Sequence, residues 1–253
     1  MSVESVAKDD FAIAGKQARI AKCALWIAAF LTAAGLFFGD HLSSFPFWEE
    51  ILVIQAILLC AYLLLNLGSS LSNFKARKTK INDLIDNSFN TEIANHHSEN
   101  YYDNEEIRNG TMKLLYNTAE SCFFSYREMQ SMKYSECTKA LIPLGILIVG
   151  LIVNKAEVIM AIFRISAIMI VTIQVIRFFV TLSQLKNLLD RMLYTLKHKS
   201  SSVTHINAES INYALEYETL MIWYGVKIPD RVYYAMNENL TLEWNEAKKK
   251  FAI

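Results

Sequence analysis

Two long apolar runs separated by a short polar turn constrain this chain more than any other feature. They occupy residues 140–182, with Asn154-Lys155-Ala156-Glu157 between them. A bilayer core of about 30 Å needs roughly 20 apolar residues per helix. The first run is slightly short and the second slightly long, so together they predict a membrane hairpin with a tight turn.

The composition also favours a mainly helical membrane protein. Hydrophobic residues make up 53% of the 253 residues and charged residues 20%, and there are three prolines and eight glycines. An apolar excess gathered into blocks is untypical of a soluble domain. We expect Gly68-Ser69-Ser70 to end the second block. Four blocks predict spans at about 20–39, 50–68, 138–154 and 157–183.

Basic residues mark one side of the predicted spans. The first outer loop has none, and the second has only Lys155. By the positive-inside rule, both termini are expected on the cytoplasmic side of the membrane. An alternative for the group after the second span is a contact with anionic lipid or phosphate. The cytoplasmic groups are Lys16, Arg19 and Lys22; Lys75, Arg77, Lys78 and Lys80; and Lys186, Arg191, Lys197 and Lys199.

The predicted fold is an all-α membrane protein with four transmembrane helices and a helical cytoplasmic domain. Apolar residues at helical spacing recur in both polar segments. We expect these segments to pack together below the membrane. The boundaries are 1–68 and 137–184 for the two hairpins, 69–136 for the insertion between them, and 185–253 for the C-terminal segment.

The fourth predicted span carries a polar stripe. Gln174, Arg177, Thr181 and Gln184 lie on one helical face, and Arg164 lies about 20 Å from Arg177 along the axis. Polar groups in hydrocarbon are costly, so they pair, snorkel or line a water-filled path. The stripe therefore indicates either a pore wall or a contact between helices, with Arg177 close to the interface.

Motifs for catalysis or metal binding do not stand out. His96 and His97 with Glu92 and Glu99 lack the spacing of metal ligands. No glycine-rich phosphate loop or hydrolase elbow occurs. The four cysteines form no C-x-x-C pair, and we expect small buried thiols rather than disulfides or zinc ligands. We expect no enzyme activity, cofactor or metal.

Aromatic and basic residues gather near the C-terminus. Trp223, Tyr224 and Tyr233 could stack nucleobases, and Lys227 and Arg231 stand beside them. The alternative is that these aromatic residues form the core of a helical domain.

Three stretches resemble one known family. They are INDLIDNSFN at residues 81–90, YYDN at 101–104 with LLYNTAESCFF at 114–124, and IPDRVY at 228–233. In this order around two span pairs, they resemble the S-4TM family of pore-forming effectors from bacterial anti-phage nucleotide-signalling systems. Members include CBASS-like and Hailong-type membrane channels.

The resemblance implies an inner-membrane channel that responds to a nucleotide from a partner nucleotidyltransferase and disrupts the membrane in abortive infection. The ligand would be a cyclic nucleotide or a linear oligodeoxyadenylate. A symmetric homo-oligomer, with a tetramer favoured, would enclose the pore. Ligand phosphates are expected at the basic group after the second span and at Lys227 and Arg231, and a base is expected to stack on Trp223, Tyr224 or Tyr233. The alternative function is a membrane-anchored scaffold without a pore.

Overall fold

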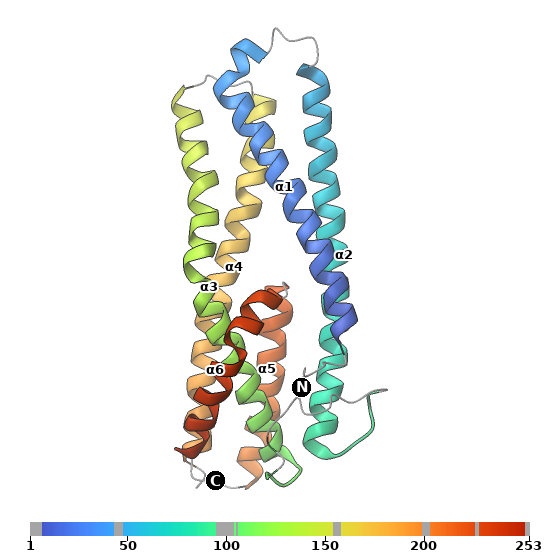
Figure 1. Cartoon of the computed structure of the whole chain (residues 1–253), viewed down its shortest axis with the longest axis vertical. Helices are drawn as coiled ribbons and strands as arrows, with labels where there is room; N and C mark the ends of the chain where they lie inside the picture. Colours follow the sequence, from blue (N-terminus) through green and yellow to red (C-terminus); the bar gives the residue numbers. More distant parts are fainter. Residues whose placement is uncertain are drawn as a thin grey trace.

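The computed structural model consists of six α-helices, and the described residues contain no strand, which confirms the all-α class. Four long helices follow the long axis of the molecule, and two shorter ones pack beside one half of it (Figure 1). The helices are α1 (Lys8–Leu42), α2 (Trp48–Phe89), α3 (Thr111–Val153), α4 (Val158–Lys197), α5 (Val203–Tyr224) and α6 (Asp230–Lys249).

The structure describes residues 7–42, 48–94, 104, 106–153, 158–198, 203–225 and 228–250. Within the helices, the side chains of residues 8, 32–33, 35–42, 48–49, 52, 140, 142–153, 158–169, 171, 203–205 and 230 are outside the description.

The four long helices continue from the predicted membrane region into the predicted cytoplasmic region. Helix α2 runs through Gly68-Ser69-Ser70 without interruption, so the expected end of the second apolar block lies inside a continuous helix. Gly68 has no side chain where Gln17 of α1 approaches, and Ser69 donates a hydrogen bond of 2.9 Å to the Ala14 carbonyl. These three residues therefore bring α1 close to α2. All three predicted domain boundaries fall inside continuous helices.

Two helix ends have a clear local cause. Helix α2 ends because Asn90 adopts a left-handed φ of 56°, and its N–H donates to the Asp86 carbonyl at 2.7 Å. Helix α5 ends before Gly225, which has a φ of 68°. Pro229 then precedes α6 as its N-cap residue. The sequence GVKIPD at residues 225–230 predicts a break between two helices, and α5 ends at Tyr224 while α6 begins at Asp230.

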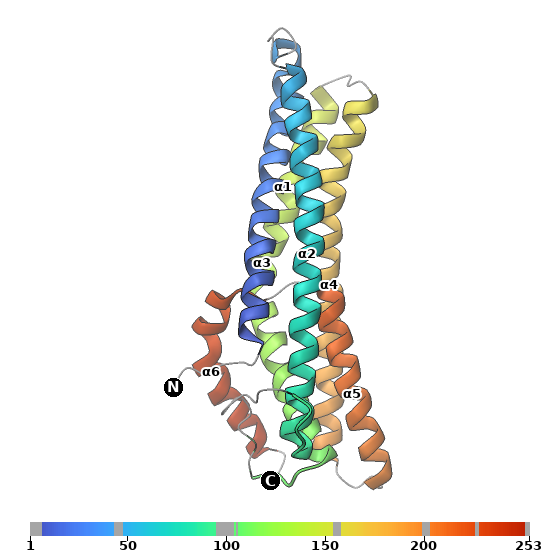
Figure 2. The same ribbon diagram turned by 90° about the vertical axis from the view of Figure 1, so that its right-hand side faces the viewer.

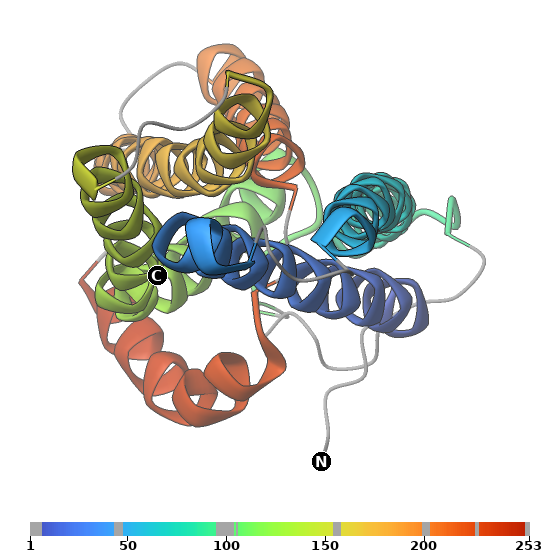
Figure 3. The ribbon, with the colours of Figure 1, turned by 90° about the horizontal axis from the view of Figure 1, so that it is seen from above.

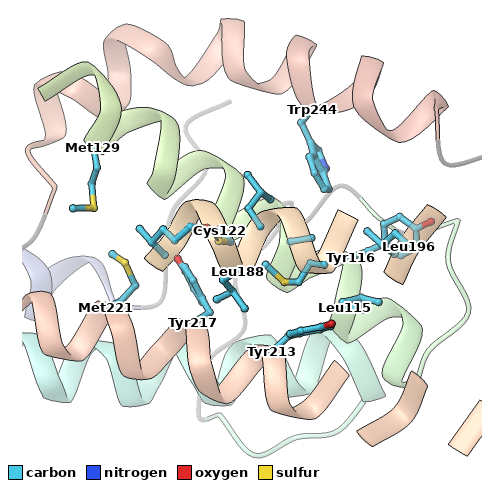
Figure 4. Close-up of a cluster of buried hydrophobic side chains, with 14 of the residues drawn as sticks. Leu115, Tyr116, Cys122, Met129, Leu188, Leu196, Tyr213, Tyr217, Met221 and Trp244 are labelled. Atoms are coloured by element: carbon cyan, nitrogen blue, oxygen red, sulfur yellow. Dashed lines mark hydrogen bonds between the residues drawn. The ribbon is translucent and has the colours of Figure 1, made fainter. Parts of the chain in front are cut away.

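The buried apolar side chains form two main clusters. The larger one joins α3, α4, α5 and α6, where Cys122, Leu188, Tyr217 and Trp244 point toward one another (Figure 4). The smaller one joins α1 and α2 through Ala21, Ala24, Leu25, Ala28, Leu59 and Tyr62. We call α1–α2 the hairpin and α3–α6 the body. Seen from above, α2 and the first half of α1 lie to one side of α3 and α4 (Figure 3).

Among the described residues, one helical segment, Val53–Phe89, is long and apolar enough to cross a bilayer. Of its most apolar window, 22% is buried inside the chain, which is little for the core helix of a soluble protein. Side chains of the other three predicted spans are described only in part. The four-span arrangement therefore stays a prediction.

Candidate functional site

Gln174 forms a hydrogen bond between the body and the hairpin. Its amide nitrogen on α4 donates to the hydroxyl of Tyr62 on α2 at 2.7 Å. Because each polar group is the hydrogen-bond partner of the other, the free-energy cost of placing both in predicted membrane spans is lower. This contact accounts for Gln174 without a water-filled path inside one subunit.

Arg177 packs on an aromatic ring near the end of α5. Its guanidinium carbon lies 5.1 Å from the ring centre of Trp223, which is 52% exposed. A cation over an indole face is attracted by the quadrupole of the ring. Arg and Trp are also common at the level of lipid headgroups. The pair therefore joins the predicted fourth span to helix α5, which belongs to the predicted cytoplasmic segment.

Thr181 and Arg164 complete the predicted stripe. Thr181 is fully buried, and its hydroxyl has no hydrogen-bond partner. It therefore faces the interior of the body rather than water. Arg164 lies within α4, and its side chain is outside the described residues. Gln174, Arg177 and Thr181 form or face packed contacts inside one subunit, whereas Gln184 is exposed. The first three residues therefore favour the contact between helices over the pore wall.

The basic residues after the second predicted span point in different directions. Lys75 is exposed and pairs with Asp10 at 3.1 Å. Arg77 is buried, with Glu218 of α5 at 3.7 Å and the ring centre of Phe11 at 5.5 Å. Lys78 is exposed and Lys80 is half-buried. Arg77 therefore already has a carboxylate partner inside the protein.

The C-terminal candidates lie in three different environments. Tyr224 belongs to the core of the body, and burial raises the pKa of its hydroxyl. Arg231 is exposed and Tyr233 is half-buried on α6. Lys227 lies outside the described residues. Helix α6 packs on α3, while α2 lies on the other side of α3 (Figures 2 and 3). One subunit thus does not bring Arg231 and Tyr233 together with the basic group of α2.

A buried amide network joins the first two stretches that carry the family resemblance. The side-chain amide of Asn117 donates to the side-chain oxygen of Asn87 at 2.8 Å and to the Ser88 hydroxyl at 3.2 Å. The Asn104 amide donates to Asn117 and to Glu120, both at 2.8 Å. These hydrogen bonds attach the end of α2 to the start of α3, so the network secures the base of the hairpin.

A second polar group, buried between α2, α3 and α5, contains three charged side chains. Arg77 and Glu218 are 8% and 6% exposed, and Glu128 of α3 is also buried. Desolvation raises the pKa of Glu128 to about 7, although Lys80 and Arg77 act to lower it. We refer to Arg77, Glu128 and Glu218 as the charge cluster. The sequence contains no signal for it beyond acidic residues on the apolar sides of helices.

Replacing Glu128 with glutamine should make the stability of the protein less dependent on pH. The wild-type carboxyl binds its proton more tightly in the folded state, so its contribution is full below pH 4.5 and is lost as the pH rises through about 7. At 1.36 kcal/mol per pH unit, the change from 4.5 to about 7 corresponds to about 3 kcal/mol.

Thermal unfolding in detergent at pH 5 and pH 8 measures this effect. Glu128→Gln should raise the melting temperature at pH 8 and change it little at pH 5. Glu238→Gln, at an exposed position of α6, is the control and should behave like the wild type at both pH values. An equal shift at both pH values would contradict the assignment to Glu128.

In the described part of the chain, no group of three or more His, Cys, Asp or Glu residues could hold a metal ion. His96, His97 and Glu99 lie outside that part. All four cysteines are free thiols. The expectation that they are buried holds for Cys122 and is wrong for Cys23 and Cys60, which are exposed, while Cys137 is half-buried.

Comparison with known proteins yields no relative: neither a family model, nor a curated protein, nor a solved structure matches this chain.

Proposed function

We propose that the chain is a four-span protein of the bacterial inner membrane that assembles into a nucleotide-gated ion channel and permeabilises the membrane in anti-phage defence. The observation that carries the proposal is the contact between Arg177 on α4 and Trp223 on α5. It connects a predicted pore helix directly to the end of a predicted cytoplasmic helix. A ligand that moves α5 would thereby move α4.

An exposed apolar surface supports the membrane part of the proposal. Large apolar side chains on α1 and α2 are at least two-fifths exposed. Exposure of so much apolar surface to water would be unfavourable. The positions recur on several helical faces, as expected for helices with lipid on more than one side. They are Trp26, Ile27 and Phe30 on α1, and Val53, Ile54, Ile57, Leu63, Leu64 and Leu67 on α2.

The proposed pore lies between subunits. Gln174 is engaged with Tyr62, and Thr181 is buried, so one subunit offers neither to a central water path. A closed homo-oligomer, with a tetramer favoured, encloses a path with few additional contacts because every subunit uses the same surface. Exposed α4 residues Ile173, Ile176 and Val180 are available to lipid or to a neighbouring subunit.

The proposed ligand is a nucleotide or short oligonucleotide, cyclic or linear. Lys75, Lys78 and Arg231 are exposed basic residues outside the predicted spans. Since α2 and α6 lie on different sides of α3, we propose that phosphate groups are held by residues of two neighbouring subunits. A ligand that binds one state of the ring more tightly shifts the population toward that state.

Planar-bilayer current from the purified protein tests the proposal. Current is recorded with and without nucleotide extract from cells that carry the neighbouring genes, and with extract treated with nuclease. A nuclease-sensitive change in current supports a nucleotide-gated channel. Folded protein that never conducts would contradict it and would favour the second candidate, a membrane-anchored scaffold in which the exposed apolar surface only tethers the chain.

Trp223→Ala should weaken the coupling between ligand and current. A cation–π contact at an exposed site contributes about 0.5–1 kcal/mol, which corresponds to about a 2- to 5-fold shift in the half-maximal extract concentration. Arg177→Ala should produce a shift of the same size. Ile222→Ala, at the adjacent exposed position of α5, is the control. Unchanged conductance, selectivity and gating in Arg177→Ala would refute this role.

A further inference from the structure

Among the described residues, polar contacts between hairpin and body join Gln174 to Tyr62, Arg77 to Glu218, and Asn117 to Asn87 and Ser88. Each of the two parts also has an apolar cluster of its own. We call this set of contacts the seam.

Apolar contacts across the seam are few in the described part of the chain. Leu84 of α2 meets Leu114 of α3, with Ala214 of α5 beside them, and Ile170 of α4 touches the hairpin cluster. Interdigitated apolar cores resist sliding because any shift opens voids. The neutral hydrogen bonds of the seam can break one at a time at a small net cost, whereas breaking the buried ion pair between Arg77 and Glu218 costs more. The seam is therefore the surface along which the two parts can move most easily.

The base of the hairpin is its firmest attachment to the body. Leu84 and Leu114 pack together there, and the amide network joins Asn87 and Ser88 to Asn117. The N–H of Gly110, directly before α3, donates to the Ser88 carbonyl at 2.7 Å. Motion of the hairpin would therefore pivot about its base.

We propose that the hairpin swings as a rigid lever about its base, and that the ion pair between Arg77 and Glu218 holds it against the body. At 1.5 Å per residue, Arg77 lies about 10 Å and Tyr62 about 33 Å from Leu84. A tilt of about 5° moves Arg77 by about 1 Å and Tyr62 by about 3 Å. The hydrogen bond between Tyr62 and Gln174 thus breaks first, while the charge cluster near the pivot sets the resting angle.

This inference goes beyond the proposed channel, because the motion can be measured without any current. Spin labels on α2 and α4 report the distance across the seam. Cys60 on α2 is exposed and serves as one site, and Ile176→Cys on α4 provides the other. Cys23 and Cys137 are replaced by serine, and buried Cys122 is kept. Dilution with unlabelled protein suppresses distances between subunits.

A second labelled pair inside the hairpin is the control. It joins Cys60 to Lys16→Cys on α1, also an exposed position, in the same serine background. Arg77→Met and Gln174→Leu are introduced separately into both pairs. Arg77→Met acts near the pivot, and Gln174→Leu acts at the far end. If one variant fails to fold, the other still tests the proposal.

The expected result is that either variant widens or shifts the distance distribution across the seam by about 3 Å, and that the distribution inside the hairpin is unchanged. An unchanged distance across the seam in a folded variant would overturn the proposal. Equal broadening of both pairs would also overturn it, because the substitutions would then loosen the hairpin itself. Neither result bears on whether the protein conducts ions.

Discussion

Arg77→Met should lower the free energy of unfolding in detergent by about 3–5 kcal/mol, the usual effect of removing one partner from a buried ion pair. The reason is the buried carboxylate that remains. The Glu218 oxygens have no hydrogen-bond partner, and Arg77 is their ion-pair partner at 3.7 Å. Glu128 also loses a nearby positive charge. Methionine keeps a similar length, so the loss of charge dominates over the loss of volume.

Two further variants separate charge from packing. Arg77→Met combined with Glu218→Met should recover most of the lost stability, since apolar replacement of both members of a buried pair is often neutral or stabilising. Lys78→Met, at the exposed neighbouring position, should change the stability by less than about 0.5 kcal/mol. If the double variant were as unstable as Arg77→Met, charge left without a partner would not be the cause.

Trp244→Ala should destabilise the packing of α6 on the body by about 3–5 kcal/mol, the usual cost of truncating a buried tryptophan. Trp244 is 1% exposed, and its ring centre lies 5.6 Å from that of Phe123 on α3. Leu240 is the other large residue buried on α6. Because few side chains attach this helix, losing the tryptophan should release it before the rest of the body unfolds.

Limited proteolysis and thermal unfolding measure that release. Trp244→Ala should be cleaved within α6 at a protease concentration that leaves the wild type intact. Leu242→Ala, at a position that is 61% exposed on the same helix, should resist like the wild type. Trp244→Phe should be milder than Trp244→Ala, because the indole N–H has no hydrogen-bond partner to lose. Equal cleavage of the alanine variants would contradict the predicted anchor.

The helical class and one helix boundary could be predicted from local sequence. The break between α5 and α6 follows from Gly225 and Pro229, whose backbone preferences act over one or two residues. At Gly68 the local sequence is ambiguous, because a glycine can end an apolar block and can also mark a close approach between helices. Only the position of Gln17, far away in the sequence, distinguishes the two cases.

The contacts of the candidate site residues could not be predicted from local sequence. The sequence placed Lys75, Arg77, Lys78 and Lys80 in one basic group because they are neighbours along the chain. On a helix these positions face different ways, and only packing against α5 directs Arg77 inward toward Glu218. The local sequence does not distinguish Glu128 and Glu218 from other acidic residues. Both are buried only because α2, α3 and α5 pack together around them.

The sequence by itself determined that this chain is helical and that its apolar residues are gathered into blocks, because periodicity and hydropathy are local properties. The tertiary structure decided how charge and polarity are used. It divides the apolar core between hairpin and body, aligns Gln174 with Tyr62, and buries Arg77 beside Glu218. Electrostatic and hydrogen-bond energies depend on distance and burial in space, and these are set by residues remote in the sequence.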